Sequence, residues 1–178
     1  NYMQIQGYFL PENPYMVIVQ HTEAIILFDI ATCKQKQFLV DYSGQANYDI
    51  AGFSYSQARQ ELVYGLVVDP YGDRQYQLML KNLKNGDEAQ LAEGINPNWS
   101  PDGNQTAFVG LDGLYVISFT DHTHEIIRLT DEPLFDPWST GPPWVGSPKP
   151  TWSPDGLWLV YHHRISERSS TGEHAFII

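Results

Sequence analysis

Apolar and polar residues alternate in short runs along most of the chain, and clusters of turn-forming residues separate these runs. An alternation with a period of two is typical of half-buried β-strands, because successive side chains of a strand point to opposite faces. One stretch shows the pattern clearly and predicts four strands: Pro97–Ser100, Thr106–Val109, Leu114–Phe119 and Glu125–Thr130. Tight turns are expected between the first three, because Pro presets φ, Asp accepts hydrogen bonds from nearby backbone N–H groups, and Gly tolerates positive φ.

The same pattern recurs along the chain. The pentapeptide W-S-P-D-G occurs twice, from Trp99 and from Trp152, and weaker copies begin at Phe9 and Phe53. These four aromatic anchors are 44, 46 and 53 residues apart. A period of about 45 residues is typical of the four-stranded blades of a β-propeller. We expect each anchor to lie between adjacent sheets.

Three segments depart from the simplest reading of the repeat. Asp87–Glu93 has a helix-forming composition, but it occupies the position of a fourth strand and is therefore predicted to be one. Two long hairpin loops are expected between second and third strands, at Asp69–Asp73 and at Ser166–Gly172. Loop tips tolerate such insertions because they lie on the surface.

The pattern therefore predicts an all-β chain, a β-propeller of four-stranded antiparallel blades with about four blades present. Residues 1–178 form a single propeller domain or a propeller segment, with units at 1–43, 44–94, 95–131 and 148–178. The last unit ends inside its third strand. In one interpretation, Tyr2–Gln6 supplies the missing strand and closes a small ring. In the other, the chain is a segment of a larger propeller, and further blades or another chain complete its edges.

Composition narrows the range of partners. The chain has 178 residues, a single cysteine, and 10 basic against 21 acidic residues, for a net charge of −11. This charge argues against a nucleic-acid partner and against a polybasic contact with membranes. The longest strongly apolar runs have five residues, so no membrane insertion is expected, and no signal peptide is visible in the sequence.

The W-S-P-D-G motif, followed by an apolar strand, a Gly turn and a second apolar strand, resembles the TolB-type, WD-repeat-like bacterial propeller repeat. This resemblance implies a periplasmic or cell-surface location. The S-P-D-G element also resembles repeats in the gating propellers of prolyl oligopeptidase and dipeptidyl peptidase relatives. That second resemblance implies a catalytic domain elsewhere in the polypeptide.

Candidate chemistry is sparse. The pairs Asp102-Gly103 and Asp155-Gly156 lack the acidic spacing of a calcium loop and are interpreted as turn residues. His122 and His124 form at most half of a zinc site, because no third ligand has a recognisable spacing. No G-x-S-x-G, G-x-G-x-x-G or phosphate-loop motif occurs. We therefore expect no catalytic residues, metal or cofactor.

The most distinctive departure from the repeat is an insertion rich in proline and aromatic residues at 132–147, which contains Phe135, Trp138 and Trp144. Aromatic residues on a stiff surface loop are typical anchors of protein interfaces. The alternative is that these rings fold back over their own blade. The insertion favours a non-catalytic scaffold that binds a protein or glycan partner through its loops, within a larger bacterial protein or assembly. The alternative function is the gating propeller of a serine peptidase.

Overall fold

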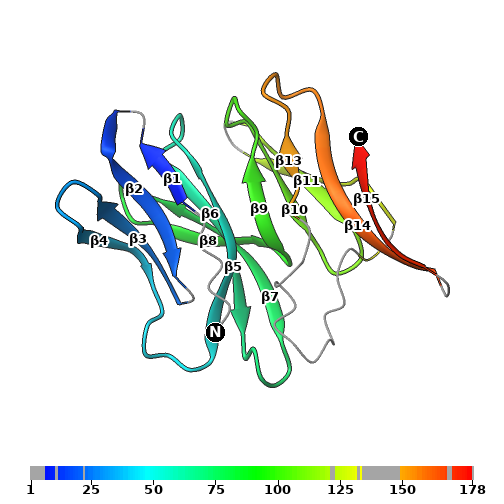
Figure 1. The fold of residues 1–178 in the computed structure, drawn as a ribbon, viewed down its shortest axis with the longest axis horizontal. Coiled ribbons are helices and arrows are strands. Elements are labelled where there is room, and N and C mark those ends of the chain that lie inside the picture. Colours follow the sequence, from blue (N-terminus) through cyan, green and yellow to red (C-terminus); the bar gives the residue numbers. More distant parts are fainter. Residues whose placement is uncertain are drawn as a thin grey trace.

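The structure is a computed structural model, and it describes residues 7–10, 12–21, 23–120, 123–131, 133, 149–167 and 170–177, with side chains described up to Tyr161. This part of the chain contains fifteen strands and no helix (Figure 1). The first sheet contains β1 (Gly7–Leu10), β2 (Asn13–His21), β3 (Ala24–Asp29) and β4 (Lys34–Asp41). The second contains β5 (Tyr48–Ser56), β6 (Glu61–Val68), β7 (Gln75–Asn82) and β8 (Glu88–Ala92).

The third sheet contains β9 (Ile95–Trp99), β10 (Gln105–Val109), β11 (Leu114–Phe119) and β12 (His124–Arg128). The fourth contains β13 (Thr151–Trp152), β14 (Leu159–Glu167) and β15 (Ser170–Ile177). In every sheet, strands that follow one another in sequence are antiparallel neighbours. The fold class is therefore the predicted one, an all-β array of antiparallel, propeller-type sheets.

Two of the sequence predictions about single segments have different outcomes. The segment with a helix-forming composition is β8, as predicted, because pairing with β7 overrides its weak intrinsic preference. The long loop expected at Ser166–Gly172 is wrong. The strands β14 and β15 pair as far as Glu167↔Ser170, so most of that segment is strand. The pairing of β14 with β15 overrides the polar composition of the segment, as strand preference depends strongly on context.

The four sheets stack side by side along an open array, with the first and fourth sheets at opposite ends (Figure 1). The strand β9 contacts β5, β6 and β7 of the second sheet and β13 of the fourth, while β2 contacts β5. Within the described residues, no extensive strand contact joins the first sheet to the fourth. The described sheets therefore form an open array. Tyr2–Gln6, the segment predicted to close a small ring, lies outside the described residues, so that alternative stays a prediction.

Apolar clusters fill the spaces between successive sheets. Phe53 is fully buried against Ile18 and Ile25 of the first sheet. Trp99 packs with Val63 and Leu78 of the second sheet. Trp152 is half-buried against the cluster that contains the third-sheet residues Val109, Leu114 and Val116. These three anchors lie between sheets as predicted, and burial of each large ring contributes about 2–3 kcal/mol.

The prediction for Phe9 is wrong, because its side chain is 65% exposed. Each buried anchor faces the sheet that precedes its own, and no described sheet precedes the first one. The adjacent residue Tyr8 points to the opposite face, as strand alternation requires. Its ring lies 5.1 Å from that of Phe53 in an edge-to-face contact. Tyr8 therefore makes the inter-sheet contact that was expected of Phe9.

No segment within the described ranges forms a helix of the length and apolar character needed to cross a membrane.

Candidate functional site

The candidate site is a cleft of about 570 Å³ at the end of β5 and β9, which we call the turn cleft. Residues from three sheets line it: Tyr8, Ser54, Tyr55, Ser56, Gln57, Ala58, Asn98, Trp99, Ser100 and Pro101. Two turns border it, one after β5 and one that begins at Pro101. Because these turns leave buried, paired strands, their positions are fixed by the sheets behind them.

The turn that begins at Pro101 is held by its own polar groups. The hydroxyl of Ser100 donates to Oδ1 of Asp102 at 2.6 Å, and the backbone N–H of Asn104 donates to the same oxygen at 3.0 Å. These hydrogen bonds lower the pKa of Asp102 below its ordinary value. Gly103 has a φ of 73°, which favours glycine. The sequence assigned Asp102 and Gly103 to a turn, and the structure confirms this.

The second copy of the motif has the same geometry. Ser153 donates to Asp155 at 2.5 Å, the N–H of Leu157 donates to Asp155 at 3.1 Å, and Gly156 also has a φ of 73°. The hydrogen bonds from Ser153 and Leu157 lower the pKa of Asp155. Both carboxylates therefore cap turns. In the part of the chain with defined placement, no group of three or more His, Cys, Asp or Glu residues could hold a metal ion.

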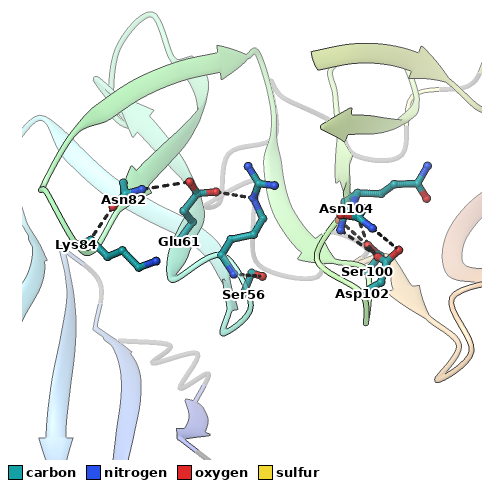
Figure 2. Close-up of polar contacts among 9 residues, drawn as sticks. Ser56, Glu61, Asn82, Lys84, Ser100, Asp102 and Asn104 are labelled. Atoms are coloured by element: carbon teal, nitrogen blue, oxygen red, sulfur yellow. Dashed lines mark hydrogen bonds and ion pairs between the residues drawn. The ribbon is translucent and has the colours of Figure 1, made fainter. Parts of the chain in front are cut away.

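Figure 2 shows a polar network around Glu61 and Asn82 of the second sheet and, apart from it, the network of the turn at Ser100, Asp102 and Asn104. Cation–π contacts of Arg59 join the turn after β5 to the third sheet. Arg59 forms an ion pair with Glu61 at 2.7 Å, and Asn82 donates to Glu61 at 3.3 Å. The guanidinium of Arg59 also lies 5.6 Å from the centre of the Trp99 ring and 5.0 Å from that of Phe119. Cation–π contacts of this kind contribute about 0.5–2 kcal/mol. The two walls of the turn cleft are therefore held in a fixed relation.

Hydrogen bonds across the sheets organise the floor of the cleft. The hydroxyl of Ser54 accepts from the backbone N–H of Trp99 at 3.0 Å and from the hydroxyl of Tyr8 at 3.4 Å. One serine side chain thus connects the first, second and third sheets. The indole Nε1 of Trp99 is buried without a hydrogen-bond partner, whereas Nε1 of Trp152 donates to the carbonyl of Asn98 at 3.0 Å.

Lys149, just before β13, reaches the same region. Its Nζ donates to the carbonyl oxygen of Phe53 at 3.1 Å and to the hydroxyl of Tyr8 at 3.3 Å, and it lies 5.6 Å from the centre of the Tyr8 ring. The ammonium group therefore ties the approach to the fourth sheet to the first and second sheets.

The chemistry of the turn cleft follows from its lining. None of its lining residues carries a charge at neutral pH, and most of them present a hydroxyl, an amide or an aromatic ring. Such groups donate and accept hydrogen bonds and offer flat apolar surface. The arrangement is suited to holding a ligand with peptide-like or hydroxyl groups.

A second hollow, which we call the outer groove, also has a volume of about 570 Å³. It lies between the second sheet and Leu111, in the turn that joins β10 to β11 of the third sheet. It is lined by Arg74, Gln75, Tyr76, Gln77, Gln90, Glu93 and Leu111. Arg74 already donates to the carbonyl of Pro70 at 2.8 Å. Only two sheets contribute to the outer groove, so fewer elements fix its shape than fix the turn cleft.

The predicted partner-binding residues Phe135, Trp138 and Trp144 lie outside the described residues, as does His122. Their role therefore stays a prediction. His124 is exposed at the start of β12, and its ring lies 6.3 Å from that of Phe119. Sequence reasoning missed the turn cleft. The available signal was the serine that directly follows three of the anchors, at Ser54, Ser100 and Ser153.

The sheet arrangement is that of a β-propeller. The structure is similar to that of TolB from Acinetobacter baumannii, with a TM-score of 0.62, 16% identity, and coverage of 98% of this chain and 41% of that one. It is also similar to the β-propeller domain of Cps50 (Swd1) from Myceliophteria thermophila, with a TM-score of 0.58, 14% identity, and coverage of 90% and 50%. It is similar as well to dipeptidyl peptidase 4 from Porphyromonas gingivalis, with a TM-score of 0.57, 12% identity, and coverage of 98% of this chain and 28% of that one.

These likenesses establish the fold. No protein-family model matches the chain, and no curated protein matches it in sequence. The chain spans half or less of the length of each of these three propeller-containing proteins.

Proposed function

We propose that the chain is a non-catalytic propeller scaffold that binds a protein partner at the turn cleft. The main observation behind this proposal is the lining of the turn cleft, which consists of uncharged hydroxyl, amide and aromatic groups. Three sheets contribute these groups, and hydrogen bonds between the sheets hold them in place. A pre-formed site of this kind loses little conformational entropy when a partner binds.

A peptide segment fits this lining better than a glycan does. Tyr8, Tyr55 and Trp99 offer ring faces and edges, and Ser56, Gln57 and Asn98 offer hydrogen-bond partners for a peptide backbone. Tyr and Trp are enriched at the centres of protein interfaces because they supply large rigid surfaces with a polar tip. The insertion at 132–147 would add further aromatic contacts to the same partner.

The wider setting is part of the same proposal. The resemblance to TolB-type repeats supports a bacterial protein or assembly that works in the periplasm or at the cell surface. The open array of sheets supports a scaffold that is completed by further blades or by another chain.

The gating propeller of a serine peptidase is the second candidate. The similarity to a dipeptidyl peptidase favours this second candidate. It covers 98% of this chain but only 28% of the peptidase, so the similar region is only part of that protein. This candidate requires an α/β-hydrolase domain in the complete polypeptide. A complete reading frame that encodes only further blades would exclude it.

Site-specific crosslinking tests the main proposal. A photoreactive amino acid at Gln57, on the exposed rim of the turn cleft, is expected to capture one defined protein in cells. The same group at Tyr71, whose side chain is 90% exposed on a distant hairpin, serves as the matched control and should not capture it. With the captured protein purified, Tyr55→Ala should weaken its binding about tenfold or more, and Tyr71→Ala should not. Equal capture from both positions would contradict the proposal.

The contribution of the insertion has its own test. Replacement of both Trp138 and Trp144 by Ala should weaken binding of the same partner and leave the unfolding transition unchanged. A folded double variant with normal binding would remove the insertion from the interface and leave the turn cleft as the proposed site.

A further inference from the structure

Two buried serines of the turn cleft have protons to offer to a ligand. The Oγ of Ser54 accepts two hydrogen bonds, from the N–H of Trp99 at 3.0 Å and from the hydroxyl of Tyr8 at 3.4 Å. Two is the acceptor capacity of a hydroxyl, so Ser54 can still donate its own O–H but can accept no further bond. The Oγ of Ser56 accepts from the N–H of Arg59 at 3.4 Å. Among the described residues, neither serine hydroxyl donates a hydrogen bond.

Two larger side chains of the same lining add further donors. Within the described part of the chain, the hydroxyl of Tyr55 and the side-chain amide of Asn98 make no hydrogen bond. Burial raises the pKa of Tyr55 above its ordinary value, and the nearby charge of Glu12 adds to this effect. The hydroxyl of Tyr55 therefore keeps its proton at neutral pH. Four side chains of the turn cleft thus have a proton available for a ligand.

Rigid apolar surface continues from the cleft across the neighbouring turn. Pro101 lines the turn cleft and is exposed. The turn at Gly156 lies directly beside it, because a Cβ on Gly156 would be 3.7 Å from Cδ of Pro101. The next residue, Leu157, is 74% exposed, and its backbone N–H is held by Asp155 at 3.1 Å. A bound segment that leaves the cleft over Pro101 therefore meets Leu157 next.

We propose that the partner segment in the turn cleft is proline-rich and lies there as a polyproline II helix that continues over Pro101 toward Leu157. This inference rests on the proposed function, because it names the kind of segment that the cleft holds. A polyproline II helix has no internal hydrogen bonds, so its carbonyl oxygens are free to accept from the four donors.

The absence of an N–H group in proline suits the floor of the cleft. A ligand N–H placed against Ser54 would find its acceptor positions occupied, and a buried donor without a partner costs binding free energy. Proline brings no such donor. Its ring packs on aromatic and proline surfaces, here those of Tyr55 and Pro101, which is the usual way in which proteins bind polyproline II segments.

Fluorescence anisotropy with a labelled decaproline peptide tests the proposal. The control probe is a labelled Gly-Ser peptide of the same length, which has as many backbone carbonyls but is flexible and carries N–H groups. The 178-residue chain is expected to bind decaproline about tenfold more tightly than the Gly-Ser peptide, or better. Unlabelled cellohexaose, which represents a glycan, should not displace decaproline.

Substitutions locate the contact on the chain. Tyr55→Phe removes only the hydroxyl and should weaken decaproline binding about fivefold, the effect of one lost hydrogen bond. Leu157→Ser should weaken it about threefold, because part of an apolar contact is lost. Tyr71→Ala, at a side chain that is 90% exposed on a distant hairpin, is the control and should bind as the wild type does. Circular dichroism of each variant checks that the fold is retained.

Several results would overturn the inference. They are equal binding of the two peptides, displacement of decaproline by cellohexaose, and decaproline binding that Tyr55→Phe and Leu157→Ser both leave unchanged.

The crosslink from Gln57 separates this inference from the proposed function. A captured protein that is crosslinked through a proline-rich segment supports both. A captured protein that is crosslinked through a segment without proline supports the turn cleft as a protein-binding site and overturns the polyproline II inference. A chain that captures no protein and does not bind decaproline contradicts both.

Discussion

The two copies of W-S-P-D-G have nearly the same local structure and different surroundings. In both, the serine hydroxyl donates to the aspartate and accepts a backbone N–H at 2.9 Å, and the glycine has a φ of 73°. The surroundings differ because β9 of the third sheet packs closely against β5, β6 and β7 of the second sheet, whereas the short strand β13 of the fourth sheet contacts the third sheet through β9. Trp99 is 6% exposed, whereas Trp152 is only half-buried. The pentapeptide therefore determines the turn, and the neighbouring sheet determines how much that turn stabilises the fold.

The largest expected difference is between the two anchors. Trp99→Ala should lower the free energy of unfolding by about 4 kcal/mol, because it leaves a cavity among Val63, Leu78 and Phe108. Trp152→Ala should cost about 2 kcal/mol, because solvent already reaches part of its ring. Urea unfolding followed by circular dichroism measures both. Equal costs would show that the third sheet covers Trp152 as well as the second sheet covers Trp99.

The two turn glycines should differ next. Alanine at either position is strained by a φ of 73°, at a cost of about 1 kcal/mol. At Gly103 the new Cβ would also lie 2.7 Å from the hydroxyl of Ser56, whereas at Gly156 the nearest atom is 3.7 Å away, on Pro101. Gly103→Ala should therefore cost about 3 kcal/mol and Gly156→Ala about 1 kcal/mol in the same unfolding assay.

The double variant Gly103→Ala with Ser56→Ala is the control for this comparison, because it removes the hydroxyl that the new Cβ would meet. It should recover part of the cost of Gly103→Ala. If the double variant recovers none of the lost stability, the cost of Gly103→Ala comes from backbone strain alone, and there is no steric contact between the two turns.

A third difference should appear at the indole nitrogens. Trp152→Phe removes a hydrogen bond to the carbonyl of Asn98, whereas Trp99→Phe removes none, because its Nε1 is buried without a partner. Both changes also reduce ring volume. Replacement of each tryptophan by 3-benzothienylalanine, which keeps the two-ring shape and has sulfur in place of the N–H group, removes the hydrogen bond alone and should cost about 1 kcal/mol more at position 152 than at position 99. An extra cost at Trp99 instead would reveal an acceptor for its indole in solution.

The same distinction explains how far the sequence could predict the molecule. The turns at Asp102-Gly103 and Asp155-Gly156, and the strands around them, follow from residues within a few positions of one another. The burial of Phe9 could not be predicted, because it depends on whether another sheet covers it. The turn cleft was missed for the same reason. The hydrogen bonds of Ser54 to Tyr8 and Trp99 join residues 46 and 45 positions apart, and no local pattern specifies such a separation.

The smallest expected effect concerns the two aspartates, and here the copies should agree. Hydrogen bonds from Ser100 and Asn104 lower the pKa of Asp102, and those from Ser153 and Leu157 lower the pKa of Asp155. An acid whose pKa is lower in the folded state stabilises the fold above its unfolded pKa, and that stabilisation is lost as the pH falls through the folded pKa. We therefore expect the difference in urea midpoint between the wild type and Asp102→Asn, or Asp155→Asn, to be constant above about pH 5 and to shrink in acid. Because the hydrogen bonds are local, both differences should shrink alike. A pH dependence found only at Asp102 would show that the internal position of the third sheet alters the turn itself, in addition to its burial.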